Sequence, residues 1–260
     1  MIRVLYIGDV VGQPGRRALH QKLEHVVDRE RIDFTIVNVE NAAGGFGVTE
    51  AIMHELSDLP INAYTSGNHI WDKKDFVDNY EHYPHVIRPA NYPSGNAGKG
   101  KVIRQTAGGV NVAVLQFMGN VFMPPIDNPF HCADRELADV DAKVIIVDIH
   151  GEASSEKQAF GRYLDGRVSA VLGTHTHVPT ADERILPNGT AYQTDVGMTG
   201  AYDSVIGFRP EEALHRFLLN TPRKLEVAKR DIRLSGAMVE IDETSGRASR
   251  IVRIHELVAD

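Results

Sequence analysis

Cysteine and long apolar runs are almost absent from this chain of 260 residues. Cys132 is the only cysteine, so no internal disulfide bond can form, and no Cys–His signature surrounds it as a nucleophile would require. No stretch approaches the about 18 uninterrupted apolar residues of a membrane span. The chain passes from Met1 directly into a strand pattern, without the features of a secretion signal. We therefore expect a cytoplasmic protein without a membrane partner.

Basic residues are fewer than acidic residues in this chain. The sequence has 28 lysines and arginines against 35 aspartates and glutamates, which gives a net charge of -7. Binding to long nucleic-acid polymers requires basic patches, so no such partner is expected. A single small nucleotide is not excluded, because its phosphate can meet the local charge of a metal. Neither a Gly-x-Gly-x-x-Gly motif nor a Gly-Lys-Ser/Thr phosphate loop occurs.

The first half of the chain alternates strand and helix patterns. Strands are predicted at residues 2–7, 33–39 and 63–66, and helices at 16–27, 50–59 and 72–80, the last with Asp72 as its cap. This alternation favours right-handed crossovers and a largely parallel sheet.

The second half contains shorter elements. We predict a hairpin from 101–106 and 110–116, followed by a proline-rich loop over 123–130. A strand is predicted at 143–149, and then a helix that runs to Leu164 and begins with a capping box of Ser155 and Gln158. Short strands dominate after residue 180. No repeat or linker divides the chain, so a single domain over residues 1–260 is expected.

Five polar clusters follow apolar strand patterns, and they carry the functional signal. They are Gly8-Asp9, Glu40-Asn41, Gly67-Asn68-His69, His150 and Gly173-Thr174-His175-Thr176-His177. Side chains at the ends of such strands meet at one edge of a sheet, where α/β proteins bind ligands. Alternation along an extended segment would point both His175 and His177 the same way. These residue types bind transition metals.

Each cluster also has an ordinary structural interpretation. Asp9 would cap the next helix, Asn68 would occupy a turn, and His150 alone is more often a hydrogen-bonded residue than a ligand. Phe130 and His131 are candidates for a base pocket, but a phenylalanine such as Phe130 is more often simply part of core or loop packing. The repetition of the pattern at five strand ends favours a metal site.

The order of these clusters resembles the calcineurin-like metallophosphoesterase superfamily. The likeness is closest to its YmdB-like branch, on the segments Glu40-Asn41-Ala42-Ala43-Gly44-Gly45-Phe46-Gly47 and Thr194-Asp195-Val196-Gly197-Met198-Thr199-Gly200, and it extends from Ile2 to about Leu257. The resemblance implies a layered α/β sandwich, in which two mixed β-sheets pack face to face with helices outside.

The resemblance further implies a dinuclear phosphodiesterase. Its pattern assigns Asp9, Asn41 and His177 to the first ion, Asn68, His150 and His175 to the second, and Glu40 to the bridge. The ions would be divalent or trivalent, with iron favoured and manganese or zinc as alternatives. The implied reaction is attack of a metal-bound hydroxide on small phosphodiesters, 2′,3′-cyclic or related cyclic nucleotides, with His69 as general acid.

One position departs from the superfamily pattern. Most members carry Gly-Asp-x-His at the first cluster, whereas this chain has Val11 in place of the histidine. Glu40 stands where an aspartate usually bridges, and Asn41 beside it offers an oxygen for the missing ligand.

One alternative function and the oligomeric state stay open at this point. A nucleotide-responsive regulatory scaffold could retain the same residues as a structural metal site, and turnover would separate it from an enzyme. The sequence also leaves open whether the chain forms a homo-oligomer.

Overall fold

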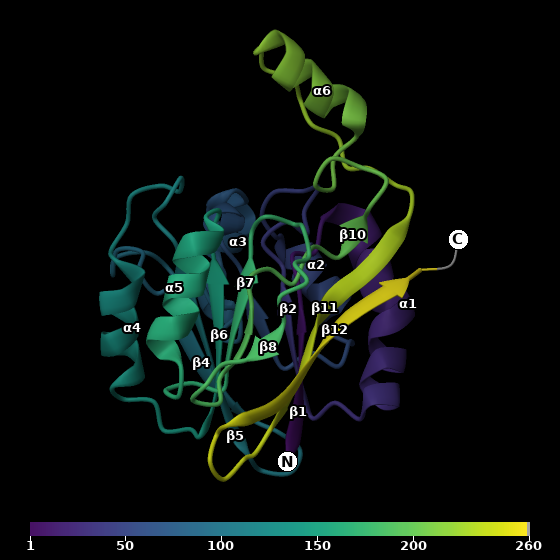
Figure 1. Cartoon of the computed structure of the whole chain (residues 1–260). Helices are drawn as coiled ribbons and strands as arrows, with labels where there is room; N and C mark the ends of the chain where they lie inside the picture. The colour runs from purple at the N-terminus through teal and green to yellow at the C-terminus, as the bar shows by residue number, and fades with distance from the viewer. Residues whose placement is uncertain (259–260) are drawn as a thin grey trace.

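Two mixed β-sheets lie face to face in the computed structural model, which describes residues 1–258 (Figure 1). The first sheet contains, in spatial order, β10 (Gly200–Ala201), β11 (Ile232–Ile241), β1 (Ile2–Ile7), β2 (Phe34–Asn38) and β3 (Ala63–Thr65), with β12 (Ala248–Leu257) beside β11. The second contains β4 (Lys101–Gln105), β5 (Asn111–Met118), β6 (Val144–His150), β7 (Ala170–Thr174), β9 (Ala191–Gln193) and β8 (Arg184–Ile185). The predicted α/β sandwich is confirmed.

Helices cover the outer faces of both sheets. They are α1 (Gly12–Glu30), α2 (Glu50–Leu56), α3 (Lys74–Asp78), α4 (Pro129–Leu137) and α5 (Ser154–Leu164). A further helix, α6 (Pro210–Leu219), does not cover either sheet (Figure 1), and two 3-10 turns are η1 (Asn68–Trp71) and η2 (Tyr80–His82). Figure 1 shows α1 on one side of the sandwich and α4 and α5 on the other.

Alternation along the strands builds three apolar layers. In β1, Val4 and Tyr6 belong to the core between the sheets, whereas Leu5 and Ile7 pack with Leu19 of α1. In the second sheet, likewise, one set of side chains faces the other sheet and the intervening set faces α4 and α5. Successive strand residues point to opposite faces, and a sheet covered on both sides therefore reads as a continuous apolar run.

The parallel strands also agree with the predicted alternation. β1 runs parallel to β2 and β2 to β3, while β5, β6, β7 and β9 run parallel in the second sheet. The carboxyl ends of these strands consequently face the same end of the sandwich, where the loops that follow them meet.

Some local predictions were wrong. The loop predicted over 123–130 ends at Asn128, and Pro129–Leu137 form α4, because Asn128 caps the helix through its side chain and Pro129 occupies the first turn, where a missing N–H has no cost. The predicted capping box of Ser155 and Gln158 is absent, since α5 begins at Ser154 without a side-chain cap. Asp72 does not cap a helix but contacts His69.

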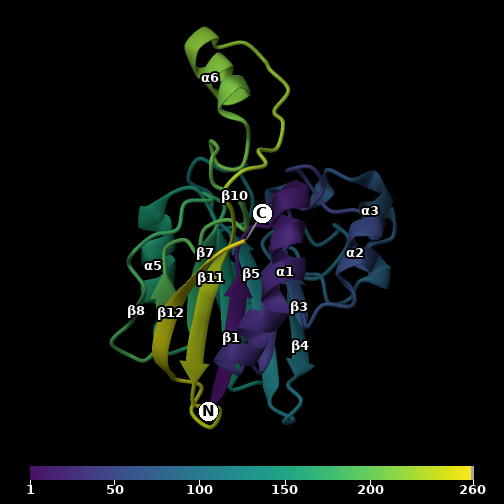
Figure 2. The same ribbon diagram turned by 90° about the vertical axis from the view of Figure 1, so that its right-hand side faces the viewer.

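Helix α6 stands apart from the sandwich at the end of an arm, as both views show (Figures 1 and 2). Phe217 and Leu218 on this helix are strongly exposed. Over residues 1–258, no helix has both the length and the apolar character that crossing a membrane would demand.

The core between the sheets should dominate stability. Ile146 of β6 is fully buried there, so Ile146→Ala should lower the free energy of unfolding by about 2–5 kcal/mol. Glu24→Ala, on the exposed side of α1, should change it by no more than about 0.5 kcal/mol. Urea titrations of both variants provide the measurement. Equal, small effects would contradict the assignment of this layer as the core.

Candidate metal centre

The five polar clusters of the sequence lie together at the carboxyl end of the parallel strands. Asp9 follows β1, the pair Glu40 and Asn41 follows β2, and Asn68 and His69 open η1 after β3. His150 is the last residue of β6, and His175 and His177 follow β7. Two sheets therefore contribute to one site.

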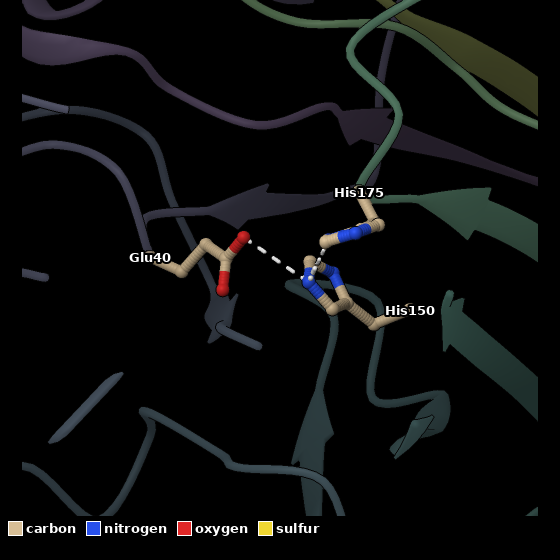
Figure 3. Close-up of side chains that lie close together, drawn as sticks. All are labelled: Glu40, His150 and His175. Atoms are coloured by element: carbon tan, nitrogen blue, oxygen red, sulfur yellow. Dashed lines mark hydrogen bonds and ion pairs between the residues drawn. The ribbon is translucent and has the colours of Figure 1, made fainter. Parts of the chain in front are cut away.

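The closest group forms around His150 (Figure 3). Its Nε2 lies 3.1 Å from Glu40 Oε1, 3.1 Å from His175 Nδ1 and 3.0 Å from Asn68 Oδ1. One ring nitrogen carries at most one proton, so it cannot satisfy three partners by hydrogen bonding. Ligand atoms held at about 2.1 Å from one ion, at right angles, lie about 3.0 Å apart. The spacing thus fits donors that share a cation.

The outer nitrogen of His150 is fixed by a buried relay. Nδ1 lies 2.9 Å from Thr174 Oγ1, and the Thr174 hydroxyl donates to Asp148 Oδ1 at 2.7 Å. The hydroxyl proton is committed to Asp148, so Nδ1 must be the donor to Thr174. The lone pair of neutral His150 is then on Nε2, which faces the cluster. This is how surrounding groups orient a metal-binding histidine.

The other two imidazoles are held in the same manner. His175 Nε2 lies 3.3 Å from Glu152 Oε2, which leaves Nδ1 toward His150. His177 Nδ1 donates to the carbonyl of Ile206 at 2.8 Å, which leaves Nε2 as an acceptor. All three rings therefore direct an unprotonated nitrogen into the site when they are neutral.

A second group of donors lies around Asn41. Its Nδ2 is 3.1 Å from Glu40 Oε1 and 3.0 Å from His177 Nε2. A half turn of the amide would present its oxygen to the same partners. Asp9 is near enough to His177 for the charge of that imidazole to oppose the rise in the Asp9 pKa, while its Oδ2 accepts the His175 backbone N–H at 3.2 Å. Glu40 contacts both groups, because its Oε1 lies 3.1 Å from His150 Nε2 and 3.1 Å from Asn41 Nδ2.

Asp9 gives the clearest evidence that positive charge belongs here. It is fully buried, and its Oδ1 has no hydrogen-bond partner. An unsatisfied buried carboxylate oxygen is costly unless a cation is nearby. The residues of the second group therefore also fit a metal ion.

Burial and mutual charge shift the acids and bases of the site. Burial raises the pKa of Asp9 to about 6. Burial also opposes ionisation of Glu40, but the charge of His150 and its hydrogen bond outweigh this and lower the pKa of Glu40 to about 2. For His150, burial disfavours the cation, whereas Glu40 raises the pKa to about 9. Burial lowers the pKa of His175 to about 3. A metal would replace the proton that otherwise balances Glu40.

The histidine pair is not part of an extended segment, which corrects the prediction from the sequence. β7 ends at Thr174, and His175 and His177 have positive φ values of 95° and 64°. Their rings consequently reach different partners, His150 and Asn41. Such backbone angles are unfavourable for residues other than glycine and persist where the surroundings impose them.

A buried ion pair imposes this conformation. Lys157 Nζ donates to the Thr174 carbonyl at 2.6 Å and to Asp195 Oδ2 at 2.8 Å. The same Asp195 oxygen accepts the backbone N–H of Thr176 at 3.1 Å and its hydroxyl at 2.7 Å. Lys157 and Asp195 thereby clamp the segment that carries the two histidines.

His69 lies at the edge of the site rather than among the clustered donors. Its Nδ1 is 2.9 Å from Asp72 Oδ2, and its backbone N–H donates to Glu40 Oε2 at 3.1 Å. The side chain is 30% exposed, so a substrate can reach it. The ring of Phe46 lies against it, 5.0 Å away between centroids.

Sequence reasoning missed the groups that orient the histidines. Asp148, Thr174, Glu152 and Lys157 all hold ligand candidates or their backbone in place. For Asp148 a signal existed, because it is a carboxylate within an apolar strand, two residues before His150 and hence on the same face. The contacts of Thr174, Glu152 and Lys157 join segments that are apart in the sequence, so no sequence pattern around these residues predicts them.

Known proteins resemble this chain over nearly its whole length. The sequence model of the YmdB-like protein family matches residues 5–254. The 2′,3′-cyclic-nucleotide 2′-phosphodiesterase of Bacillus subtilis (strain 168) is 47% identical over 255 residues, which cover 97% of this chain and 96% of that protein.

Two crystal structures share the whole fold. A hypothetical protein from Thermus thermophilus has a TM-score of 0.93 and 42% identity, over 98% of this chain and 99% of that one. A novel phosphatase from Mycoplasma pneumoniae has a TM-score of 0.93 and 33% identity, over 98% and 93%.

The sandwich and its buried cluster of acids and histidines define a protein of the metallophosphoesterase type. The chain belongs to the YmdB-like family. This relationship confirms the predicted enzyme class, a phosphodiesterase.

The relay behind His150 leads to a prediction. Thr174→Val removes the acceptor of the His150 Nδ1 proton, so the affinity for the metal bound by His150 should fall by about 10- to 100-fold. Competition with a fluorescent chelator measures this. Thr190→Val is the matched control, because Thr190 is also buried and hydrogen-bonded but serves the Val168 carbonyl. Equal losses of affinity in both variants would refute the role of the relay.

Proposed function

We propose that this protein is a metal-dependent phosphodiesterase acting on small phosphodiesters, with 2′,3′-cyclic nucleotides as the leading candidates. The observation that carries the proposal is the convergence of Glu40, Asn68 and His175 on the single Nε2 atom of His150. The 47% identity to the Bacillus subtilis phosphodiesterase supports the choice of substrate class.

The two donor groups supply the residues for two ions. Asn68, His150 and His175 would hold one ion, Asp9, Asn41 and His177 the other, and Glu40 would reach both. Oxygen and nitrogen donors without thiolate suit iron, manganese or zinc, and we propose iron. When bound, a metal pair of this kind would stabilise the charge on phosphoryl oxygens. It would also lower the pKa of a metal-bound water molecule to about 7.

His69 is the proposed general acid. Asp72 accepts a hydrogen bond from Nδ1 and so orients the ring, which leaves Nε2 to pass a proton to the leaving oxygen. A positioned acid of this type matters most when the leaving group is a poorly stabilised alkoxide, such as a ribose oxygen.

The charge of the site favours diesters over monoesters. None of the seven proposed ligands or their immediate polar neighbours is a free lysine or arginine, and Lys157 is already paired with Asp195. A dianionic monoester usually requires an arginine or lysine partner, whereas a diester carries one negative charge.

Metal content gives the first test. Protein produced with ample iron or manganese should contain about two ions per chain by elemental analysis, and His175→Ala should lose the ion held with His150. Chelation should abolish turnover and metal addition restore it, which a regulatory scaffold would not show. A value near one ion that reconstitution does not raise would contradict the dinuclear proposal.

Substrate preference gives the second test. We expect kcat/KM for 2′,3′-cyclic AMP to exceed that for 3′-AMP by at least about tenfold, because the site lacks a cationic partner for a dianion. Steady-state assays on protein of known metal content measure both. A preference for 3′-AMP would overturn the diester assignment.

The role of His69 is tested by its leaving-group dependence. His69→Ala should reduce kcat for 2′,3′-cyclic AMP by about 10²- to 10⁴-fold while metal content stays unchanged. The loss should be much smaller for a p-nitrophenyl diester, whose leaving group needs little protonation. His215→Ala, on the distant α6, serves as control. A loss of equal size with both substrates would leave His69 only a positioning role.

A further inference from the structure

The segment that follows β5 begins directly beside the metal centre. Met118 pairs with His150 across β5 and β6, and the Gly119 backbone N–H donates to the His150 carbonyl at 2.9 Å. Phe122 is three residues further along, so its Cα lies within about 11 Å of that of Gly119. A nucleotide whose phosphate sits at the centre therefore has its base within reach of this segment.

The segment is held in shape by hydrogen bonds. The backbone N–H groups of Asn120 and Val121 both donate to the Glu156 carboxylate, at 2.9 and 3.1 Å. The Asn120 amide closes the loop by donating to the Ile126 carbonyl at 3.1 Å. Phe122 is therefore presented by a fixed loop.

Phe122 is exposed to an unusual degree for such a position. Its side chain is 88% exposed, and its φ of 62° is in the left-handed region that large residues avoid. A loop fixed by hydrogen bonds thus keeps a large apolar ring in water, three residues beyond the glycine that contacts the His150 carbonyl. Strained backbone of this kind is concentrated at sites that hold a ligand.

Two other phenylalanines that could serve a base already have partners. Phe46 stacks on Phe208 with 5.3 Å between centroids and lies edge-on to His69. Phe130, a candidate for a base pocket from the sequence, packs against Phe160 and Tyr163. Phe122 is left with accessible ring faces.

We propose that Phe122 is the stacking platform for the nucleobase of the substrate, and hence a specificity-determining residue. This inference rests on the proposed function, since it assumes a nucleotide whose phosphate lies at the metal centre. Stacking on an aromatic ring tolerates every base, because each has a π-face. The site should therefore discriminate nucleotides from base-free phosphodiesters rather than one base from another.

The test compares two substrates that differ only in the base. Phe122→Ala should raise KM for 2′,3′-cyclic AMP by roughly 5- to 100-fold with kcat within about twofold of wild type. The kinetics with methyl ribofuranoside 2,3-cyclic phosphate, which has the same cyclic diester without a base, should not change. Phe122→Tyr should restore the low KM. Phe217→Ala, a ring that is 83% exposed on α6, should behave as wild type.

Calorimetric binding of 3′-AMP separates this inference from the proposed function. If wild type binds 3′-AMP more tightly than Phe122→Ala but hydrolyses neither cyclic diester, the stacking role stands and the proposed reaction is wrong. If Phe122→Ala binds 3′-AMP as wild type does, or loses activity equally on both cyclic diesters, the stacking role is overturned.

Discussion

The structure depends on the burial of acidic side chains at one end of its sandwich. Asp9, Glu40 and Asp148 are all fully buried there, and the charged partners within reach are imidazoles. Removing a carboxylate from water is expensive unless opposite charge or hydrogen bonds compensate for it. The arrangement of the surrounding residues is best understood as the response to this requirement, and the proposed metal ions would supply the main compensation.

Hydrogen bonds to Asp148 join the two sheets beneath the centre. Tyr6 of β1 donates to its Oδ2 at 2.5 Å, and Gln116 of β5 donates to the same atom at 2.8 Å. Its other oxygen accepts from Thr174, so the carboxylate links the first sheet, the second sheet and His150. The strand faces that supply the apolar core therefore end in a layer of polar side chains around Asp148, and this layer positions His150. Fold and site share this layer, which is why changes behind the ligands should affect metal affinity.

Much of this was readable from the sequence, because strand ends are local signals. Apolar runs that end in Asp9, Glu40, His150 and His175 predict both the sheet and the meeting of these side chains at its edge. The left-handed backbone at His175 was not predictable, since the Lys157–Asp195 pair that imposes it joins residues far apart in the sequence. The orientation of His150 likewise depends on Thr174, in a neighbouring strand. Helix α4 was missed for a different reason. Pro129 was read as part of a proline-rich loop, whereas it occupies the first turn of the helix, a position that proline favours.

The most direct test of this account is the thermal stability of metal-free protein when one buried charge is removed. At about pH 8, loading wild type with metal to about 100 times its Kd should stabilise it by about 2.7 kcal/mol, which is about 5–11 °C in Tm for a chain of this size. Asp9→Asn keeps the shape of the side chain without its charge. We predict that metal-free Asp9→Asn melts at a higher temperature than metal-free wild type and gains less from added metal. A lower Tm for the metal-free variant, with an unchanged gain from metal, would contradict the claim that uncompensated acidic charge governs this site.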